Sequence, residues 1–590
     1  MYKNKLVFII TVLWISIIQL TNAQVKLKYD QNKSLTYAET IEAYQLLDKQ
    51  FKQARLFDMG PTDIGKPLSL FIISKNEDFD PVSIKKKGKV IVLINNGIHP
   101  GEACGIDAGV KLAQNLLYNK EYLNKFLENV VLAIIPAYNI GGMLNRSPYH
   151  RANQNGPEEH GFRGNARNLD LNRDFIKTDT RNARTFSKIF NFLKPEVFLD
   201  THTTNGSDHQ YSITLIATQH NKLHPIMGNY LNNKMVPALF AKMKESPYEL
   251  IPYVNSINRT PDKGISGYLD APMVSTGYAS LFNTFAFMTE NHVYKPFEER
   301  VLSVYHFMLS LLEFTNNNSE TISQLKKQAD KETCNKEDFV TNWKLDTSKY
   351  QELTFKGYLP KQRISQLTGK STMYYDKNDP FEKQIPYYNE YVATSHIKKP
   401  FCYIIPQAWH EAIEKLKLNE IKMSELSKDT ILQVQVYYIN DFKTSNRSYN
   451  GHFVNSGIKT RTEIQNIRFY KGDFIIRPNQ PSNNYIIQVL EPDASGSFFS
   501  WNFFDSSMEN REYFSPSVFE EKAQKLLNEN PDLNKKFETK KKEETEFAES
   551  HYAQLRFIYM NSPYYEKSYR RYPVARINDP VNLPIDSNIR

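Results

Sequence analysis

The chain has 590 residues, with 74 basic and 65 acidic side chains and a formal net charge of +9 at pH 7. This length predicts two or more domains, and the mild, evenly spread charge lacks the basic stripe of a nucleic-acid-binding protein. Only three cysteines occur, so at most one disulfide can form and the fold must be stabilised by its cores.

The N-terminus has the pattern of a secretory signal peptide. Residues 1–5 include two lysines, residues 6–20 are almost wholly apolar, and small residues precede a cut between Ala23 and Gln24. The apolar run is short for a bilayer span, and no comparable stretch follows. We therefore predict a signal peptide at residues 1–23, no membrane span, and an exported protein that is periplasmic or extracellular.

Three apolar runs are each followed or closed by a residue with metal or acid-base chemistry. Val90–Ile94 predicts a buried strand, and His99 and Glu102 follow it just before a helical pattern at residues 108–117. The runs 196–200 and 285–290 predict strands that end just before His202 and at Glu290. Because ligands bind beyond the carboxyl ends of the strands in open α/β sheets, we expect these side chains to meet at one rim.

Two histidines and one glutamate are a ligand set for catalytic zinc, which takes three protein ligands and leaves its fourth position to water. A second carboxylate is then needed as general base, and Glu290 is the candidate. An isolated H-x-x-E match is weak, so the residues between these segments carry much of the interpretation. Asn172-Arg173 offers an amide beside a planar fork suited to a carboxylate, and Arg151 supplies another fixed cation.

These segments, taken in chain order, resemble the zinc carboxypeptidase family of the carboxypeptidase A and B type. The resemblance covers Leu35 to Phe314 and rests on HPGE, an Asn-Pro-Asp-Gly-like turn at Asn139–Gly142, the R-x-N segment, DLNR, D-T-H and the late strand glutamate. It implies an exported bacterial member of the family with a C-terminal extension.

The resemblance also implies a role for each candidate residue. One Zn²⁺ per chain would be held by three ligands, Glu290 would act as general base and later acid, and Arg151 would polarise the scissile carbonyl. Asn172 and Arg173 would bind the terminal carboxylate of the substrate. A capping tyrosine is expected as well, and Tyr268 fits the family spacing better than Tyr278. The implied zinc ligands are His99, Glu102 and His202.

The implied function is a zinc metallocarboxypeptidase that hydrolyses C-terminal peptide bonds with a metal-activated water, so its partners are peptides or proteins with a free C-terminus. Two alternatives stay open. One is a peptidoglycan stem-peptide hydrolase built on the same site, and the other is a glycan- or protein-binding protein whose enzyme domain is catalytically retired. The sequence gives neither the side-chain preference nor the oligomeric state.

A change of composition predicts the domain organisation. Residues 24–315 form the predicted catalytic domain, an α/β fold with a mixed, mostly parallel central sheet flanked by helices. The charged residues 316–338 are predicted as a linker. Residues 339–590 contain short alternating runs rich in Tyr and Phe, which predicts a β-rich domain of unknown function with helices at 408–418 and 516–555. We expect a fragment that ends before Asp338 to keep the peptidase chemistry if it folds.

Overall fold

The computed structural model describes residues 24–204 and 206–585, so the predicted signal peptide lies outside the described residues. The first half is built on an eight-stranded sheet in the order β1-β2-β4-β3-β7-β12-β8-β9. The central strands β4, β3, β7 and β12 are parallel to one another, whereas β1, β2 and β8 join by antiparallel pairing. The predicted fold class, a mixed and mostly parallel sheet followed by a β-rich region, is confirmed.

Strands β3 and β4 of this sheet are buried at every position, as the continuous apolar runs predict. Its strands are β1 (Ala54–Pro61), β2 (Pro67–Ile73), β3 (Val90–Asn95), β4 (Val130–Ile135), β7 (Val197–Thr204), β8 (Ile213–Ala217), β9 (Leu250–Pro252) and β12 (Phe285–His292).

Two strands are longer than the sequence predicts. The apolar runs end before His202 and at Glu290, but β7 continues to Thr204 and β12 continues to His292. The extra polar residues stay in the sheet because β12 pairs with β7 on one side and with β8 on the other. In this parallel register Glu290 lies directly opposite His202, so the ladder itself brings the two side chains together.

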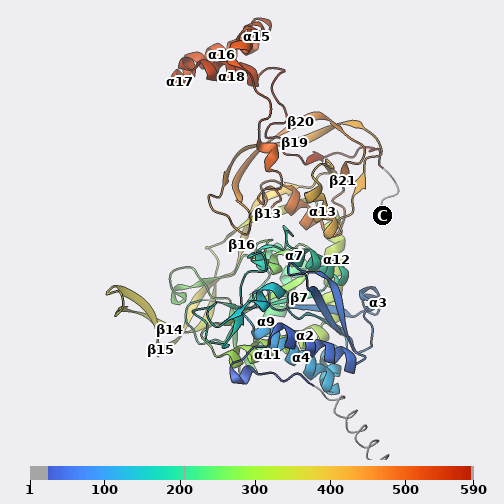
Figure 1. Cartoon of the computed structure of the whole chain (residues 1–590), viewed down its shortest axis with the longest axis vertical. Helices are drawn as coiled ribbons and strands as arrows, with labels where there is room; N and C mark the ends of the chain where they lie inside the picture. Colours follow the sequence, from blue (N-terminus) through green and yellow to red (C-terminus); the bar gives the residue numbers. More distant parts are fainter. Residues whose placement is uncertain (1–23, 205, 586–590) are drawn as a thin grey trace, which may run out of the picture.

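Helices cover both faces of the sheet (Figure 1). One face packs against α2, α4, α5, α9, α11 and α12, and the other packs against α7 and α10. The bounds are α2 (Tyr37–Gln50), α4 (Cys104–Tyr118), α5 (Lys120–Leu127), α7 (Arg181–Leu193), α9 (Val236–Lys244), α10 (Ser275–Ser280), α11 (Phe297–Asn317) and α12 (Ser319–Asn335).

The segment predicted as a linker, residues 316–338, consists mostly of α12. Ile322 and Ala329 of this helix are buried in the core of the first half. Lys326 donates hydrogen bonds to the carbonyl oxygens of Phe282 and Asn283, just before β12 begins. The segment is therefore packed against the first half along much of its length.

The second half contains a six-stranded sheet in the order β18-β21-β17-β22-β19-β20 and several further strands and helices. The β14–β15 ribbon and the α15–α18 helices project from the body of the molecule (Figure 1). The strands are β13 (Asp338–Leu345), β14 (Gln351–Ile364), β15 (Ser371–Tyr388), β16 (Tyr391–Lys398), β17 (Cys402–Ile405), β18 (Ser424–Glu425), β19 (Thr430–Thr444), β20 (Asn455–Phe469), β21 (Phe474–Ile476) and β22 (Ala575–Ile577). The helices are α13 (His410–Leu418), α14 (Asn483–Leu490), α15 (Pro516–Glu529), α16 (Pro531–Glu543), α17 (Thr545–Glu549) and α18 (His551–Met560).

The two halves share one apolar core on the α7 face of the sheet. Phe198 and Tyr278 of the first half belong to the same cluster of buried side chains as Tyr485 and Trp501 of the second. The rings of Phe282 and Tyr485 stack with their centroids 5.4 Å apart. A fragment that lacks the second half would therefore expose part of this core to water.

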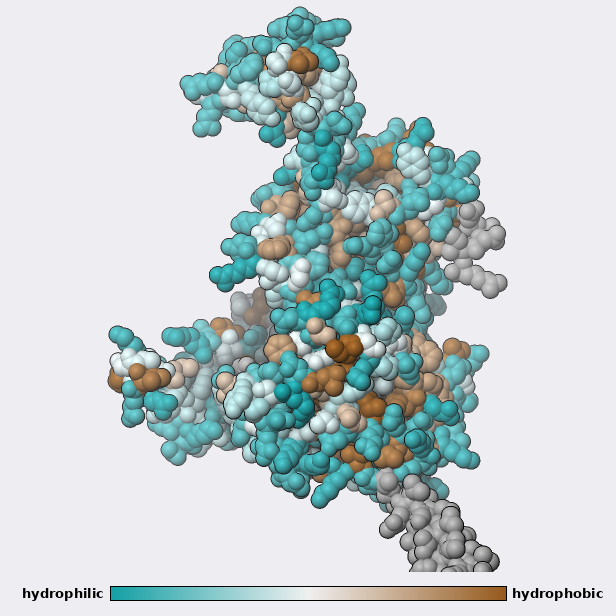
Figure 2. All heavy atoms as spheres, in the orientation of Figure 1, coloured by the Kyte–Doolittle hydropathy of each residue, from teal (hydrophilic) through white to brown (hydrophobic). Residues whose placement is uncertain are grey.

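The hydrophilic surface and the absence of disulfides among the described residues fit a fold that is stabilised by its apolar cores. The face in Figure 2 is largely hydrophilic, with apolar side chains in small groups among polar ones. Within residues 24–204 and 206–585, every helix is too short or too polar to span a bilayer. Cys104, Cys334 and Cys402 are all free thiols.

Candidate metal centre and substrate site

Three buried side chains converge at the carboxyl ends of β3 and β7. His99 and Glu102 come from the loop between β3 and α4, and His202 comes from β7 itself. Nδ1 of His202 lies 3.2 Å from Nδ1 of His99 and 3.1 Å from Oε2 of Glu102, and Nδ1 of His99 lies 3.3 Å from Oε1 of Glu102. Two imidazole nitrogens and a carboxylate oxygen that face one point are a donor set suited to catalytic zinc.

Glycine residues allow the loop to approach β7 this closely. Gly97 has a positive φ of 72°, which an L side chain rarely adopts. A Cβ atom on Gly105 would lie 2.0 Å from Oγ1 of Thr201, so only glycine lets the start of α4 lie against β7. The backbone N–H of Thr203 then donates to Oε2 of Glu102 at 2.9 Å and fixes that carboxylate.

A carboxylate lies within hydrogen-bond distance of Nε2 of each histidine, the ring nitrogen that faces away from the other ligands. Oδ1 of Asp170 lies 2.9 Å from Nε2 of His99, and Oδ2 of Asp200 lies 2.8 Å from Nε2 of His202. Ser275 donates to Asp200 at 2.6 Å. With a proton on each Nε2, the Nδ1 lone pairs face the common point, which is the arrangement that orients histidine ligands of metals. Asp170 and Asp200 lie in the DLNR and D-T-H segments, and the alternation of Asp200 and His202 on one face of β7 is the sequence signal for the second contact.

The charges at this point suit a cation. Burial opposes a charge on Glu102, but His99 and Arg151 outweigh it and hold the pKa of that carboxyl well below its usual range. Burial also opposes protonation of His202, yet Asp200 and Glu102 raise the pKa of its imidazole well above the usual value. The negative charges of Asp200 and Glu102 that favour a proton on His202 also favour a divalent cation, which competes with that proton for the imidazole lone pair. The residues present therefore fit zinc.

Glu290 projects from β12 beside this cluster, on the strand position next to His202. Burial raises the pKa of its carboxyl to about 8; the positive charge of His202 opposes this shift and the negative charge of Glu102 adds to it. Its side chain forms no hydrogen bond to the other described residues. A free carboxyl group with a pKa near neutral can accept a proton and return it.

Two arginines reach Glu102, and only Arg151 lies in one of the sequence motifs. Nη1 of Arg151 donates to Oε1 of Glu102 at 2.9 Å, and its Nη2 donates to the carbonyl oxygen of Thr203 at 3.3 Å. Nη1 of Arg163 lies 3.5 Å from the same Oε1, and its Nη2 donates to Asp170 at 2.8 Å. Arg163 is 47% exposed and follows β6 (His160–Gly161) in a loop that carries no motif, so no sequence signal identified it.

Asn172 and Arg173 lie in the short turn beyond Asp170. Oδ1 of Asn172 accepts a hydrogen bond from the backbone of Ser275 at 3.0 Å, and its Nδ2 lies 3.5 Å from Nε2 of His202. Nη1 of Arg173 donates to the carbonyl oxygen of Asn172 at 2.8 Å. The predicted carboxylate anchor therefore adjoins the candidate metal ligands.

Of the two candidate capping tyrosines, one is available at the site. Tyr278 is fully buried in the α7 core and donates to Asn419 at 2.5 Å. Burial raises the pKa of Tyr268, while the positive charge of Arg173 lowers it, so the Tyr268 hydroxyl lies within electrostatic range of the anchor. Its ring lies 5.9 Å from that of Tyr253.

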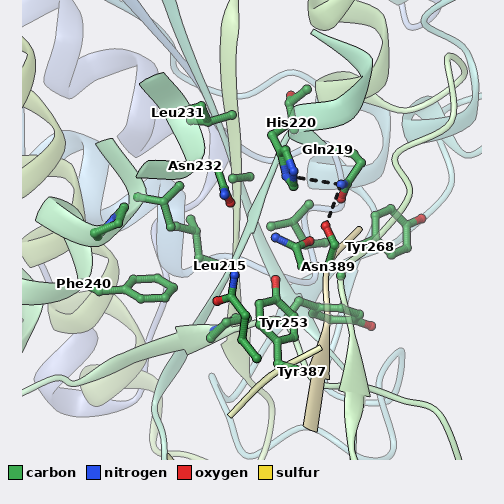
Figure 3. A pocket seen from close by; sticks show the side chains of 18 of the residues that line it. Leu215, Gln219, His220, Leu231, Asn232, Phe240, Tyr253, Tyr268, Tyr387 and Asn389 are labelled. Atoms are coloured by element: carbon green, nitrogen blue, oxygen red, sulfur yellow. Dashed lines mark hydrogen bonds between the residues drawn. The ribbon is translucent and has the colours of Figure 1, made fainter. Parts of the chain in front are cut away.

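Tyr253 and Tyr268 line a cavity of about 240 Å³ (Figure 3). Leu215 of β8 and Phe240 of α9 form part of its apolar wall, and Tyr387 of β15 contributes from the second half. At its polar side Gln219 donates to the carbonyl oxygen of Asn389 at 3.1 Å and lies 3.4 Å from Nδ1 of His220. The lining of this cavity contains none of the candidate metal ligands.

Comparison with known proteins points to one enzyme class. A zinc carboxypeptidase family model matches residues 41–275. Carboxypeptidase 2 from Trichophyton equinum is 22% identical over 433 residues, which cover 70% of this chain and 74% of that protein. Probable carboxypeptidase 2 from Arthroderma benhamiae is also 22% identical, over 68% of this chain and 73% of its own length.

Solved structures of carboxypeptidases show a more distant likeness. A metallo-carboxypeptidase from Burkholderia cenocepacia has 17% identity and a TM-score of 0.36, over 48% of this chain and 68% of that one. The carboxypeptidase A of Helicoverpa armigera has 14% identity and a TM-score of 0.36, over 55% of this chain and 81% of that one.

Proposed function

We propose that the chain is a metallocarboxypeptidase of the zinc carboxypeptidase family, in which His99, Glu102 and His202 hold one Zn²⁺ and Glu290 is the general base. The observation that carries the proposal is the convergence of three buried donor atoms, with an aspartate behind each histidine. Zinc bound there would polarise the scissile carbonyl and lower the pKa of a water molecule.

The residues of the chain account for the proton transfers. Glu290 takes a proton from water as the oxygen attacks the peptide carbonyl, and it gives that proton to the amine nitrogen as the C–N bond breaks. The burial of Glu290, which raises the pKa of its carboxyl, favours the protonated form that donates to the amine, and the positive charge of bound zinc would favour the carboxylate that accepts the first proton. Arg151 lies against Glu102 and supplies positive charge for the oxyanion that develops on the carbonyl oxygen.

The substrate class follows from the anchor. Arg173 and Asn172 bind the terminal carboxylate of a peptide, because a guanidinium fork pairs with a carboxylate in two parallel hydrogen bonds. Tyr268 closes over the bound end of the chain. The protein acts outside the cytoplasm, in the periplasm or beyond the cell; the pattern of residues 1–23 supports this.

A paired substrate experiment tests the proposal. The zinc-loaded protein is incubated with a peptide library as free acids and as C-terminal amides, with and without a chelator, and the products are read by mass spectrometry. We expect loss of C-terminal residues from the free acids, at a rate at least about ten times that of the amides, and no cleavage after chelation. Equal cleavage of acids and amides, or activity that resists chelation, would overturn it. Faster release from purified cell-wall fragments than from any peptide would favour the stem-peptide alternative.

A further inference from the structure

A loop of the second half reaches the carboxylate anchor of the first. This β19–β20 loop, residues 445–454, turns tightly at its tip, where the backbone of Tyr449 and His452 is paired in both directions. The tip approaches the segment that precedes Asp170, since a Cβ atom on Gly451 would lie 3.6 Å from the side chain of Leu169.

The tip makes two polar contacts with the site. Nε of Arg173 donates to the hydroxyl of Tyr449 at 2.7 Å, and the backbone N–H of Asp170 donates to Oδ1 of Asn450 at 3.0 Å. Because Nη1 of Arg173 is held by the carbonyl of Asn172, two of the three guanidinium nitrogens are fixed by the protein. Nη2 has no hydrogen-bond partner among the described residues. The guanidinium is thus oriented before any substrate arrives, and its remaining donors are free for a carboxylate.

The loop is itself held firmly by buried groups. Nε2 of His452 lies 2.8 Å from Oδ2 of Asp179. The ring of Tyr449 stacks on that of Trp501 with an interplanar angle of 15° and centroids 6.3 Å apart, and Trp501 is 2% exposed. Nζ of Lys177 lies over the same indole, 5.6 Å from its centroid. An anchor fixed in this way pays less entropy when it binds a ligand.

A cavity borders one side of the loop. It has a volume of about 700 Å³ and is also lined by residues 271–273 of the first half and 493–496 of the second. Tyr449 remains 41% exposed despite its stacking on Trp501. Tyr449 therefore borders this cavity while its hydroxyl contacts Arg173.

We propose that the β19–β20 loop is part of the substrate site, and that Tyr449 is a positioning residue that presents Arg173 to the terminal carboxylate of a peptide. Asn450 assists by fixing the backbone of Asp170. The second half thereby sets the preference for a free C-terminus. This inference rests on the proposed function, in which Arg173 binds that carboxylate.

Two substitutions in the zinc-loaded full-length protein test this inference. Tyr449→Phe keeps the ring on Trp501 and removes the hydroxyl, and Asn450→Ala removes the second contact. Tyr513→Phe is the matched control, because Tyr513 is 86% exposed and lies outside the loop. KM and kcat are measured for one peptide as free acid and as amide. The dissociation constant of the free acid is measured by calorimetry with Glu290→Gln added to each protein.

For Tyr449→Phe we expect KM and the dissociation constant of the free acid to rise about ten-fold, because an unpositioned Arg173 makes weaker hydrogen bonds to the substrate carboxylate, while kcat changes less than about two-fold. KM for the amide should stay unchanged, and Asn450→Ala should shift the same quantities by a smaller factor. A purely structural contact would lower the melting temperature and leave the acid-to-amide preference intact.

Two results would overturn the inference, and they are distinguishable. If the unaltered protein prefers free acids but both loop variants keep KM within about two-fold of its value, the loop has no part in the substrate site. If the unaltered protein itself does not prefer free acids, Arg173 is not a carboxylate anchor, and the proposed function fails together with the inference.

Discussion

Replacing Asp200 with asparagine tests whether the outer carboxylates set the metal affinity. Asp200 is fully buried, and its Oδ2 lies 2.8 Å from Nε2 of His202 and accepts a 2.6 Å hydrogen bond from Ser275. Asparagine preserves the size and one acceptor but removes the negative charge that holds the Nε2 proton. The loss of such a partner typically weakens metal binding 10- to 100-fold, or about 1.4 to 2.7 kcal/mol. We expect the zinc dissociation constant to rise by that factor.

The assay is a zinc titration against a competing chromophoric chelator at fixed pH, with circular dichroism as a check on folding. Asp208→Asn is the matched control, because this carboxylate lies 3.3 Å from Nε2 of His292, a histidine outside the candidate ligands. Its zinc affinity should match that of the unaltered protein. If the folded Asp200→Asn variant binds zinc with an affinity within about three-fold of that of the unaltered protein, Asp170 and Asp200 do not set the metal affinity in the way described.

Three further predictions follow from the site and the core. Glu290→Gln should retain zinc by elemental analysis while kcat falls about 10²- to 10⁴-fold; loss of the metal would instead identify Glu290 as a ligand. Burial raises the pKa of Asp107 from 3.8 to about 8, so its contribution to stability is fully present below pH 3.8 and is lost as the pH rises through 8. The gain in melting temperature from Asp107→Asn should therefore grow between those two pH values, and a gain that does not change with pH would contradict the assignment. A chain that ends at residue 337 should fail to give a cooperative thermal transition, because it loses part of the shared core; a soluble, active fragment would show that the first half is sufficient.

The last of these predictions concerns the condition attached to the expectation from the sequence, namely that a fragment ending before Asp338 folds. The composition changes near residue 315, but the core cluster that contains Tyr278 also contains Tyr485 and Trp501. A change in composition shows where strand patterns replace helical ones. It does not show which apolar faces pack against each other, because that depends on tertiary structure. The same reason explains α12, whose sparse apolar positions, such as Ile322, gave little sign that the helix is packed.

The candidate site was predictable where the signal is local. His99 and Glu102 follow a continuous apolar run, and such runs are typical of buried parallel strands. The ends of β7 and β12 were less predictable, because polar residues such as Thr203 stay in the ladder only when neighbouring strands pair with them. Tyr449 carried no signal at all, since it meets Arg173 across 276 residues of sequence.

The most direct test of the account is the zinc content of the purified protein and of His202→Ala, measured by mass spectrometry of the metal. We predict about one zinc per chain in the unaltered protein and almost none in the variant. An unaltered protein that remains free of metal after incubation with zinc, or a variant that keeps its zinc, would contradict the claim that His99, Glu102 and His202 form the metal centre.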